Sequence, residues 1–299
     1  MEASAHSLSA PAIWTLAVRP KTLWAAVAPV IVGSALAWRE DVFHWPAGMA
    51  ALIGALLLQI TANFANDLHD FERGTDSHDR IGPLRVTQAG LVSTRQMRAA
   101  LAVVIGLAVV PGLYLVIRGG WPILIVGLAG IVSAILYTGG GIAYGYRGWG
   151  ELFVFLFFGL AAVAGTYYVH ALTVHPLAFW LAVPMGCLAV AILVVNNLRD
   201  IDTDRKAGKR TLAVRLGRSG GRLEYILMIV VACAIPILLV IRSDSRWGVL
   251  LASASLLGAI PILRTIFGST EGPALNNALA QTARLQLLYA ILLSIGLNL

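Results

Sequence analysis

The sequence predicts an all-α, polytopic membrane protein, and three observations lead to that prediction. Hydrophobic residues make up 58% of the 299 positions, and only 12% are charged. A soluble domain has roughly a quarter of its residues charged, so this chain lacks the charge to cover a water-facing surface. The apolar residues also gather in long stretches without the alternation of a membrane β-barrel strand. Backbone groups in lipid must bond within their own segment, so these stretches are expected to be helices.

Nine stretches are long enough to cross the hydrocarbon core, which needs roughly 17–25 apolar residues in a helix. They are expected at Thr22–Trp38, Ala47–Ala65, Met97–Ile117, Trp121–Thr138, Leu152–His170, Leu177–Asn196, Leu223–Ile241, Trp247–Phe267 and Thr282–Leu299. We expect one domain over residues 1–299, with a short N-terminal segment at 1–18. The two longest polar connections are expected to be Asp-rich loops at 66–96 and 197–222.

Basic residues are distributed unequally between the two sides of the predicted membrane. Nine spans place the N-terminus and the even-numbered connections on one side, and that side holds 18 of the 22 Lys and Arg residues. Positive charge is retained on the cytoplasmic side. The N-terminus and both Asp-rich loops are therefore expected in the cytoplasm of a cell (inner) membrane, with the C-terminus outside. The same bias explains the net charge of +7 without a nucleic-acid partner.

The two Asp-rich connections resemble each other. They hold eight of the 15 Asp and Glu residues, and they open with the similar segments Asn66–Asp70 and Asn196–Asp200, which lie 130 residues apart. An offset of four helices returns the chain to the same side in the same direction. The sequence therefore favours an architecture of four plus four helices followed by a ninth.

The second acidic segment has the spacing of a metal site. Asn196, Asp200 and Asp204 are four residues apart, so their side chains would lie on one face of a helix. Two carboxylates in one column need a cation between them. Hard oxygen ligands select Mg²⁺ or Mn²⁺, and Mg²⁺ usually combines a carboxylate or two with substrate phosphate oxygens. Two such clusters facing each other predict a site for a metal–diphosphate complex.

The first acidic segment departs from this spacing. Asn66 and Asp70 are four residues apart, but Gly74 stands where the third ligand would be. We expect Asp76 to complete the set, with Asp79 as the alternative, provided that Gly74 ends the helix. Asp70 and Asp200 are the carboxylates on which catalysis is expected to depend most.

Basic side chains follow both acidic segments, and Arg and Lys are suited to phosphate oxygens. Four are expected to contact a diphosphate, although each would also satisfy the cytoplasmic charge bias alone: Arg80, Arg85, Lys209 and Arg215. A natural substrate for such a site in a membrane is an isoprenoid diphosphate. Metal and Arg would stabilise the departing diphosphate, and a dry cavity would protect the allylic cation from water. Five aromatic residues would line that cavity or form an interfacial belt: Tyr137, Tyr144, Tyr146, Trp149 and Phe153.

The segment from Asn66 to Gly90 resembles the UbiA superfamily of intramembrane prenyltransferases. Its pattern is Asn-Asp-x-x-Asp-x₃-Gly-x-Asp-x₃-Arg-x-Gly-Pro-x-Arg, followed by Thr-Gln-x-Gly. Supporting segments lie at Arg19–Leu23, Tyr144–Glu151 and Asn196–Leu212. The Arg-Ile-Gly-Pro-Leu-Arg stretch is most similar to the branch of the superfamily that uses naphthoate acceptors.

The resemblance implies nine helices around a central cavity and a Mg²⁺-dependent reaction. A polyprenyl group would pass from a prenyl diphosphate to 1,4-dihydroxy-2-naphthoate, with loss of the acceptor's carboxylate, giving a demethylmenaquinone. Arg19 joins the expected diphosphate-binding residues. Glu151 would orient or deprotonate an acceptor hydroxyl, or else complement the dipole of its helix. The alternatives are a sister enzyme that uses 4-hydroxybenzoate or a phytyl donor and, remotely, a secondary transporter, whose polar site would lie near the membrane midplane.

The charge bias makes a direct prediction of orientation. In a background without Cys187 and Cys233, single cysteines at Ser77 and Ser219 should resist a membrane-impermeant maleimide in intact cells, because both positions are expected in the cytoplasm. A cysteine at Ser243 should be labelled. The reverse pattern of labelling would overturn the orientation.

Overall fold

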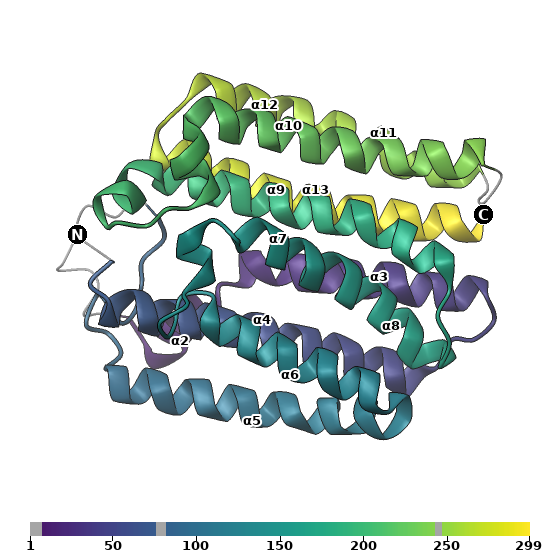
Figure 1. The fold of residues 1–299 in the computed structure, drawn as a ribbon, viewed down its shortest axis with the longest axis horizontal. Helices are drawn as coiled ribbons and strands as arrows, with labels where there is room; N and C mark the ends of the chain where they lie inside the picture. Colours follow the sequence, from purple (N-terminus) through teal and green to yellow (C-terminus); the bar gives the residue numbers. More distant parts are fainter. Residues whose placement is uncertain (1–7, 76–81, 243–246) are drawn as a thin grey trace.

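The computed structural model describes residues 8–75, 82–242 and 247–299, and the regular structure in these ranges is entirely helical. The elements are, in chain order, α2 (Ala10–Val18), α3 (Pro20–Arg39), α4 (Trp45–Glu72), α5 (Thr94–Gly119), α6 (Trp121–Leu136), the 3₁₀ turn η1 (Tyr144–Arg147), α7 (Gly150–Val154), the π-helix η2 (Phe155–Ala161), α8 (Ala162–Ala171), α9 (Pro176–Lys206), α10 (Leu212–Ile241), η3 (Trp247–Val249), α11 (Leu250–Ser255), η4 (Leu256–Gly258), α12 (Ala259–Gly268) and α13 (Gly272–Asn298). Figure 1 shows the long helices lying side by side in one bundle.

The prediction of an all-α polytopic membrane protein is confirmed. Within the described ranges, eight helices are long and apolar enough to cross a membrane. The expected ninth span is shorter than predicted: α6 has 16 residues, which at about 1.5 Å each reach about 24 Å, less than the ~30 Å of a hydrocarbon core. It ends just before three consecutive glycines, at 139–141, which disfavour a helix. The count of nine spans is therefore not confirmed.

Prolines and capping side chains determine where several spans begin. α4 and α9 start alike, each with a histidine followed by proline within the first turn. The Nδ1 atom of His44 accepts the N–H of Ala47 at 3.3 Å, and Nδ1 of His175 accepts the N–H of Leu177 at 3.1 Å. These bonds satisfy backbone donors that the first helical turn leaves without partners.

Helix α9 lies at the centre of the packing. It packs against α10, α13 and η2, and α13 packs in turn against α3, so the last span contacts the first. Most of the large buried apolar cluster surrounds α9, including the fully buried Leu181, Met185 and Leu188. A helix with buried residues on all sides provides a fixed frame for the acidic residues at its C-terminal end.

Both acidic motifs are carried on the ends of spanning helices. α4 continues through Asn66 and Asp70 to Glu72, and Gly74 follows with a φ of 65°, so the helix ends there as the sequence analysis required. α9 continues to Lys206, so the segment 197–222, expected as a loop, is helical except for residues 207–211 and a kink at Gly217, whose φ is 72°. Leu198 and Ile201 are buried, and their packing extends α9 beyond its apolar span.

Two glycines bring α9 into backbone contact with the span at Gly150–Ala171. A Cβ built on Gly159 would lie 2.8 Å from the Cα of Gly186 and 2.9 Å from the carbonyl oxygen of Ala182. Gly159 belongs to the π-helix η2, a one-turn widening of the span. In lipid, helix association depends on such close packing because the hydrophobic effect does not drive one apolar helix onto another.

Replacing Gly159 with valine should therefore destabilise the bundle. The new side chain meets backbone atoms of α9 that cannot move without shifting the helix, and overpacking of this kind costs about 1–3 kcal/mol. We expect Gly159→Val to lower the midpoint of thermal denaturation in detergent. Gly165→Val is the matched control, because a Cβ on Gly165, in the same span, meets no atom within 4 Å. Equal midpoints for the two variants would contradict the assignment of Gly159 as a packing contact.

Candidate active site

The ends of α4 and α9 place the two acidic motifs at the same end of the bundle, opposite the C-terminus (Figure 1). Asp70 and Asp204, one from each motif, are buried with 2% and 9% of their surfaces exposed. The ammonium group of Lys209 lies between them, with Nζ 3.4 Å from Oδ1 of Asp70 and 3.5 Å from Oδ1 of Asp204. A single cation therefore links the two motifs.

Asp70 has further partners among the described residues. The Arg85 guanidinium donates to its Oδ2 at 2.5 Å, and the hydroxyl groups of Tyr146 and Thr75 donate to Oδ1. Burial, together with the charge of Asp70 and the hydrogen bond to it, raises the pKa of Tyr146 well above its ordinary value. The phenol therefore stays protonated at neutral pH and serves as a hydrogen-bond donor to the carboxylate.

Asp67 places Arg85 beside Asp70. It is 1% exposed, and its carboxylate accepts the backbone N–H groups of Val86 at 3.2 Å and Thr87 at 3.1 Å. These bonds hold the chain after Arg85 against the end of α4. Asp67 therefore positions Arg85 beside Asp70 through these backbone hydrogen bonds.

The second motif is arranged around Arg199. Asn196, Asp200 and Asp204 all lie in α9 at helical spacing, so they share one face of the helix as predicted. Arg199 donates to both oxygens of Asp200, at 2.8 and 2.5 Å, and also to Oδ1 of Asn196 at 2.8 Å. It reaches Asn276 of α13 at 2.7 Å as well. This buried fork neutralises Asp200 and ties the motif to the last span.

The donor set fits a hard divalent cation. The buried carboxylates of Asp70 and Asp204 offer oxygen atoms, and the positive charge of Lys209 already lies between them. Among the described residues, no three His, Cys, Asp or Glu side chains converge on one point. A set of this kind suits Mg²⁺, which takes one or two carboxylates and completes its shell with substrate phosphates and water.

The other predicted site residues lie in different surroundings. Asn66 accepts a hydrogen bond from Thr138 at 3.0 Å. Arg19 joins α2 to α3 in a left-handed conformation, with a φ of 55°. Glu151 is buried and accepts a hydrogen bond from Asn197 at 2.9 Å, next to the second motif. Three of the predicted site residues lie outside the described ranges, Asp76, Asp79 and Arg80, as do Ser77 and Ser243 of the labelling prediction.

Aromatic side chains pack together near the acidic motifs, as the sequence suggested. Tyr144 stacks on Phe153 with ring centroids 4.1 Å apart, and Tyr137 meets Tyr144 edge-on at 5.3 Å. Burial raises the pKa of Tyr144 to about 12, partly offset by its hydrogen bond with Ser133. The cluster is apolar and its hydroxyl groups remain neutral at physiological pH, so it is suited to excluding water.

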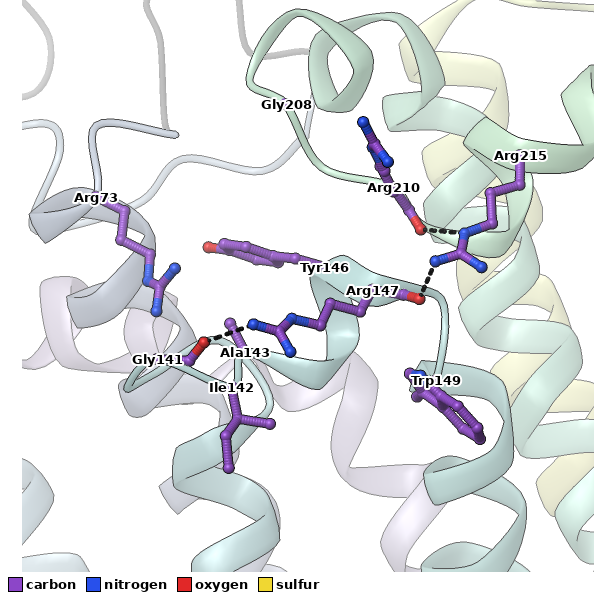
Figure 2. Close-up of a pocket in the computed structure, with 10 residues that line it drawn as sticks. All are labelled: Arg73, Gly141, Ile142, Ala143, Tyr146, Arg147, Trp149, Gly208, Arg210 and Arg215. Atoms are coloured by element: carbon purple, nitrogen blue, oxygen red, sulfur yellow. Dashed lines mark hydrogen bonds between the residues drawn. The ribbon is translucent and has the colours of Figure 1, made fainter.

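Arg215 lies apart from the carboxylates, in a surface pocket of about 440 Å³. Figure 2 shows this pocket between the end of α4, the loop around η1 and the connection from α9 to α10. Four arginines line it, together with apolar and aromatic side chains that include Tyr146: Arg73, Arg147, Arg210 and Arg215. Tyr146 also donates to Asp70, so the pocket and the acidic site share a wall.

Sequence reasoning did not find the roles of Asp67 and Arg199. Asp67 stood in the motif without an assigned function, and Arg199 was counted only toward the charge bias. The signal for Arg199 was its position inside an acidic helix segment, directly before Asp200, where an arginine has carboxylates within reach. For Asp67, its backbone partners depend on how the chain returns to α4, which residue spacing does not reveal.

Comparisons with known proteins identify the family of this chain. The family model described as "UbiA prenyltransferase family" matches residues 26–285. The chain is 38% identical to "1,4-dihydroxy-2-naphthoate octaprenyltransferase" of Escherichia coli (strain K12), covering 98% of this chain and 97% of that protein. It is 39% identical to the protein of the same name from Mycobacterium leprae (strain TN), covering 96% of each.

A solved structure has the same fold. It is described as a UbiA homolog from Archaeoglobus fulgidus bound to DMAPP and Mg²⁺, and it aligns with 94% of this chain and 99% of its own at a TM-score of 0.63. At 13% sequence identity this likeness concerns the fold alone. Family model, relatives and fold all lead to one conclusion. The chain belongs to the UbiA prenyltransferase family.

Proposed function

We propose that this protein transfers a polyprenyl group from a prenyl diphosphate to 1,4-dihydroxy-2-naphthoate. The relatives that bear the name of this activity match nearly the whole chain, at 35–39% identity in the three that cover 95% or more of both sequences. The structural observation that carries the proposal is the buried pair Asp70 and Asp204 with Lys209 between them. Interleaved acids and cations are the requirement of a metal–diphosphate site.

The acidic residues would hold the metal. Asp70 with Asn66, and Asp204 with Asp200 and Asn196, offer oxygen ligands from the two motifs, and Asp76 remains the predicted further ligand. Mg²⁺ bound there would neutralise charge on the departing diphosphate; Mn²⁺ offers the same chemistry. Arg85 and Lys209 already lie against Asp70, where they would also reach phosphate oxygens. Arg19, Arg80 and Arg215 remain predicted diphosphate ligands.

The chemistry divides into breaking one bond and forming another. The allylic C–O bond breaks and its electron pair leaves with the diphosphate, which Arg85 and Lys209 stabilise electrostatically. A ring carbon of the acceptor bonds to the allylic carbon, and the acceptor's carboxylate departs as CO₂. Both hydroxyl groups are retained, so the direct product is the hydroquinone form of a demethylmenaquinone. Glu151 is proposed to orient an acceptor hydroxyl, and the aromatic cluster at Tyr144 and Phe153 excludes water.

We propose further that the acid-bearing end of the bundle faces the cytoplasm. The charge bias of the sequence supports this orientation, and a prenyl diphosphate would then enter with its head group at the cytoplasmic interface and its tail among the spanning helices. One domain over residues 1–299 contains the whole site.

Removal of divalent metal should abolish the activity. Every proposed ligand is a hard oxygen atom, so exhaustive treatment with EDTA should stop prenyl transfer, and added Mg²⁺ or Mn²⁺ should restore it. The assay follows a radiolabelled prenyl diphosphate into a lipid-soluble product. Full turnover by the chelated enzyme would contradict the metal–diphosphate reading.

The buried acids should matter far more than their exposed neighbours. Asp70→Asn and Asp204→Asn each remove a charge from the site, and loss of one transition-state charge contact typically lowers kcat about 10²–10³-fold. Asp202→Asn and Glu72→Gln are the matched controls. Asp202 has a 58% exposed side chain paired with Arg218 at 2.6 Å, and Glu72 pairs with Arg98 at 2.5 Å. Controls as damaged as the buried variants would show that charge at this end of the bundle, and not the buried pair, determines turnover.

A further inference from the structure

In the surface pocket beside Tyr146, the described residues hold positive charge in position and supply no acid to neutralise it. Arg73 donates to the carbonyl oxygen of Gly140, Arg147 to that of Gly141, and Arg215 to those of Arg210 and Arg147. Each partner is a neutral backbone carbonyl. Among the described residues that line the pocket, none is Asp or Glu.

These hydrogen bonds hold the guanidinium groups in place and use only a few of their N–H donors. A guanidinium has five N–H donors, so each of the three anchored arginines keeps donors for a ligand. The Arg210 side chain has no hydrogen bond or ion pair with any described residue, and Figure 2 shows it at the upper edge of the pocket, on the side of Gly208 and Arg215. Four cations around one opening attract an anion and lower their mutual repulsion when it binds.

The rest of the lining indicates what kind of anion fits. Ile142 and Trp149 are more than half exposed, at 53% and 55%, and Tyr146 presents its ring to the same space. A bare inorganic anion needs only the cations. Apolar and aromatic walls beside arginines favour an anion with a flat, apolar body, and Arg binds a carboxylate through two parallel hydrogen bonds.

We propose that this pocket captures the aromatic acceptor through its carboxylate before prenyl transfer, an inference that rests on the proposed function. An aromatic acid held there lies one side chain from the acidic site, because Tyr146 lines the pocket and donates to Asp70. The pocket thereby raises the local concentration of acceptor at the entrance to the site. It assigns Arg210, and with it Arg73 and Arg147, a carboxylate ligand.

Arg210→Gln is the most informative variant, because it removes a charge without breaking a contact to a described residue. We expect the KM for 1,4-dihydroxy-2-naphthoate to rise roughly tenfold, the effect of one lost charged hydrogen bond, with the KM for the prenyl diphosphate unchanged. Arg95→Gln is the matched control: Arg95 is exposed near the start of α5, among the basic residues of the same predicted side, and does not line the pocket. It should leave both KM values unchanged.

A binding measurement separates capture from catalysis. Without prenyl diphosphate, 1,4-dihydroxy-2-naphthoate should quench the fluorescence of Trp149, identified as the quenched residue by comparison with Trp149→Phe. Arg210→Gln should weaken this binding. 1,4-Dihydroxynaphthalene, which lacks the carboxylate, should bind wild type and Arg210→Gln equally.

Three outcomes would overturn the inference. If Arg210→Gln raised the KM for the prenyl diphosphate and not that for the acceptor, the pocket would bind the leaving group. Displacement of the bound acceptor by inorganic diphosphate would have the same meaning. If the effects of Arg210→Gln appeared only in nanodiscs with anionic lipid, the pocket would bind a lipid head group. Equal affinity of wild type and Arg210→Gln for the naphthoate would remove the carboxylate contact. Failure of the proposed function is distinguishable, since wild-type enzyme would then transfer no prenyl group to 1,4-dihydroxy-2-naphthoate.

Discussion

Buried carboxylates require positive partners, and this constraint organises one end of the molecule. An ionised acid removed from water costs several kcal/mol unless a cation or several hydrogen-bond donors face it. Asp70, Asp200 and Asp204 are each met by a cation: Arg85, Arg199 and Lys209. The ion pairs of Arg85 and Lys209 hold the segment after α4 and the connection after α9 at this site. The hydrogen bond from Arg199 to Asn276 adds the last span, α13.

The same cations serve two purposes at different times. In this structure they neutralise the acids, and the fork of Arg199 and the ammonium of Lys209 hold helix ends together. A metal–diphosphate complex brings both signs of charge, positive for the carboxylates and negative for the basic side chains. When this complex binds, the carboxylates exchange their basic partners for the metal, and the basic side chains exchange the carboxylates for the diphosphate. No buried charge is left without a partner, so the complex can enter a buried site at an acceptable energetic cost.

The sequence predicted those parts of the fold and site that depend on short spacings. Helical spacing placed Asn196, Asp200 and Asp204 on one face, and Gly74 marked the end of α4, because both features are local to one helix. The apolar stretches predicted the helices, although α6 ends at Leu136, two residues before the expected end at Thr138. Resemblance, more than spacing, identified the naphthoate branch.

The remaining contacts join residues far apart in the chain. Tyr146 meets Asp70 across 76 positions, and Arg199 meets Asn276 across 77. Pairings of this kind follow from how whole helices pack, and a single sequence carries no record of them. Asp67 and Asp70 illustrate the limit: two acids three residues apart on one helix face different neighbours, one binding backbone N–H groups and the other cations.

The acids stand on rigid continuations of α4 and α9 rather than on flexible loops, and this has a consequence for the surrounding lipid. Spanning helices respond to a bilayer thicker or thinner than their apolar length by changing tilt. A change in the tilt of α4 relative to α9 would displace their ends, and with them the carboxylates, with no loop to absorb the movement. The acyl-chain length of the host membrane thus becomes one of the variables that set the separation between the two motifs.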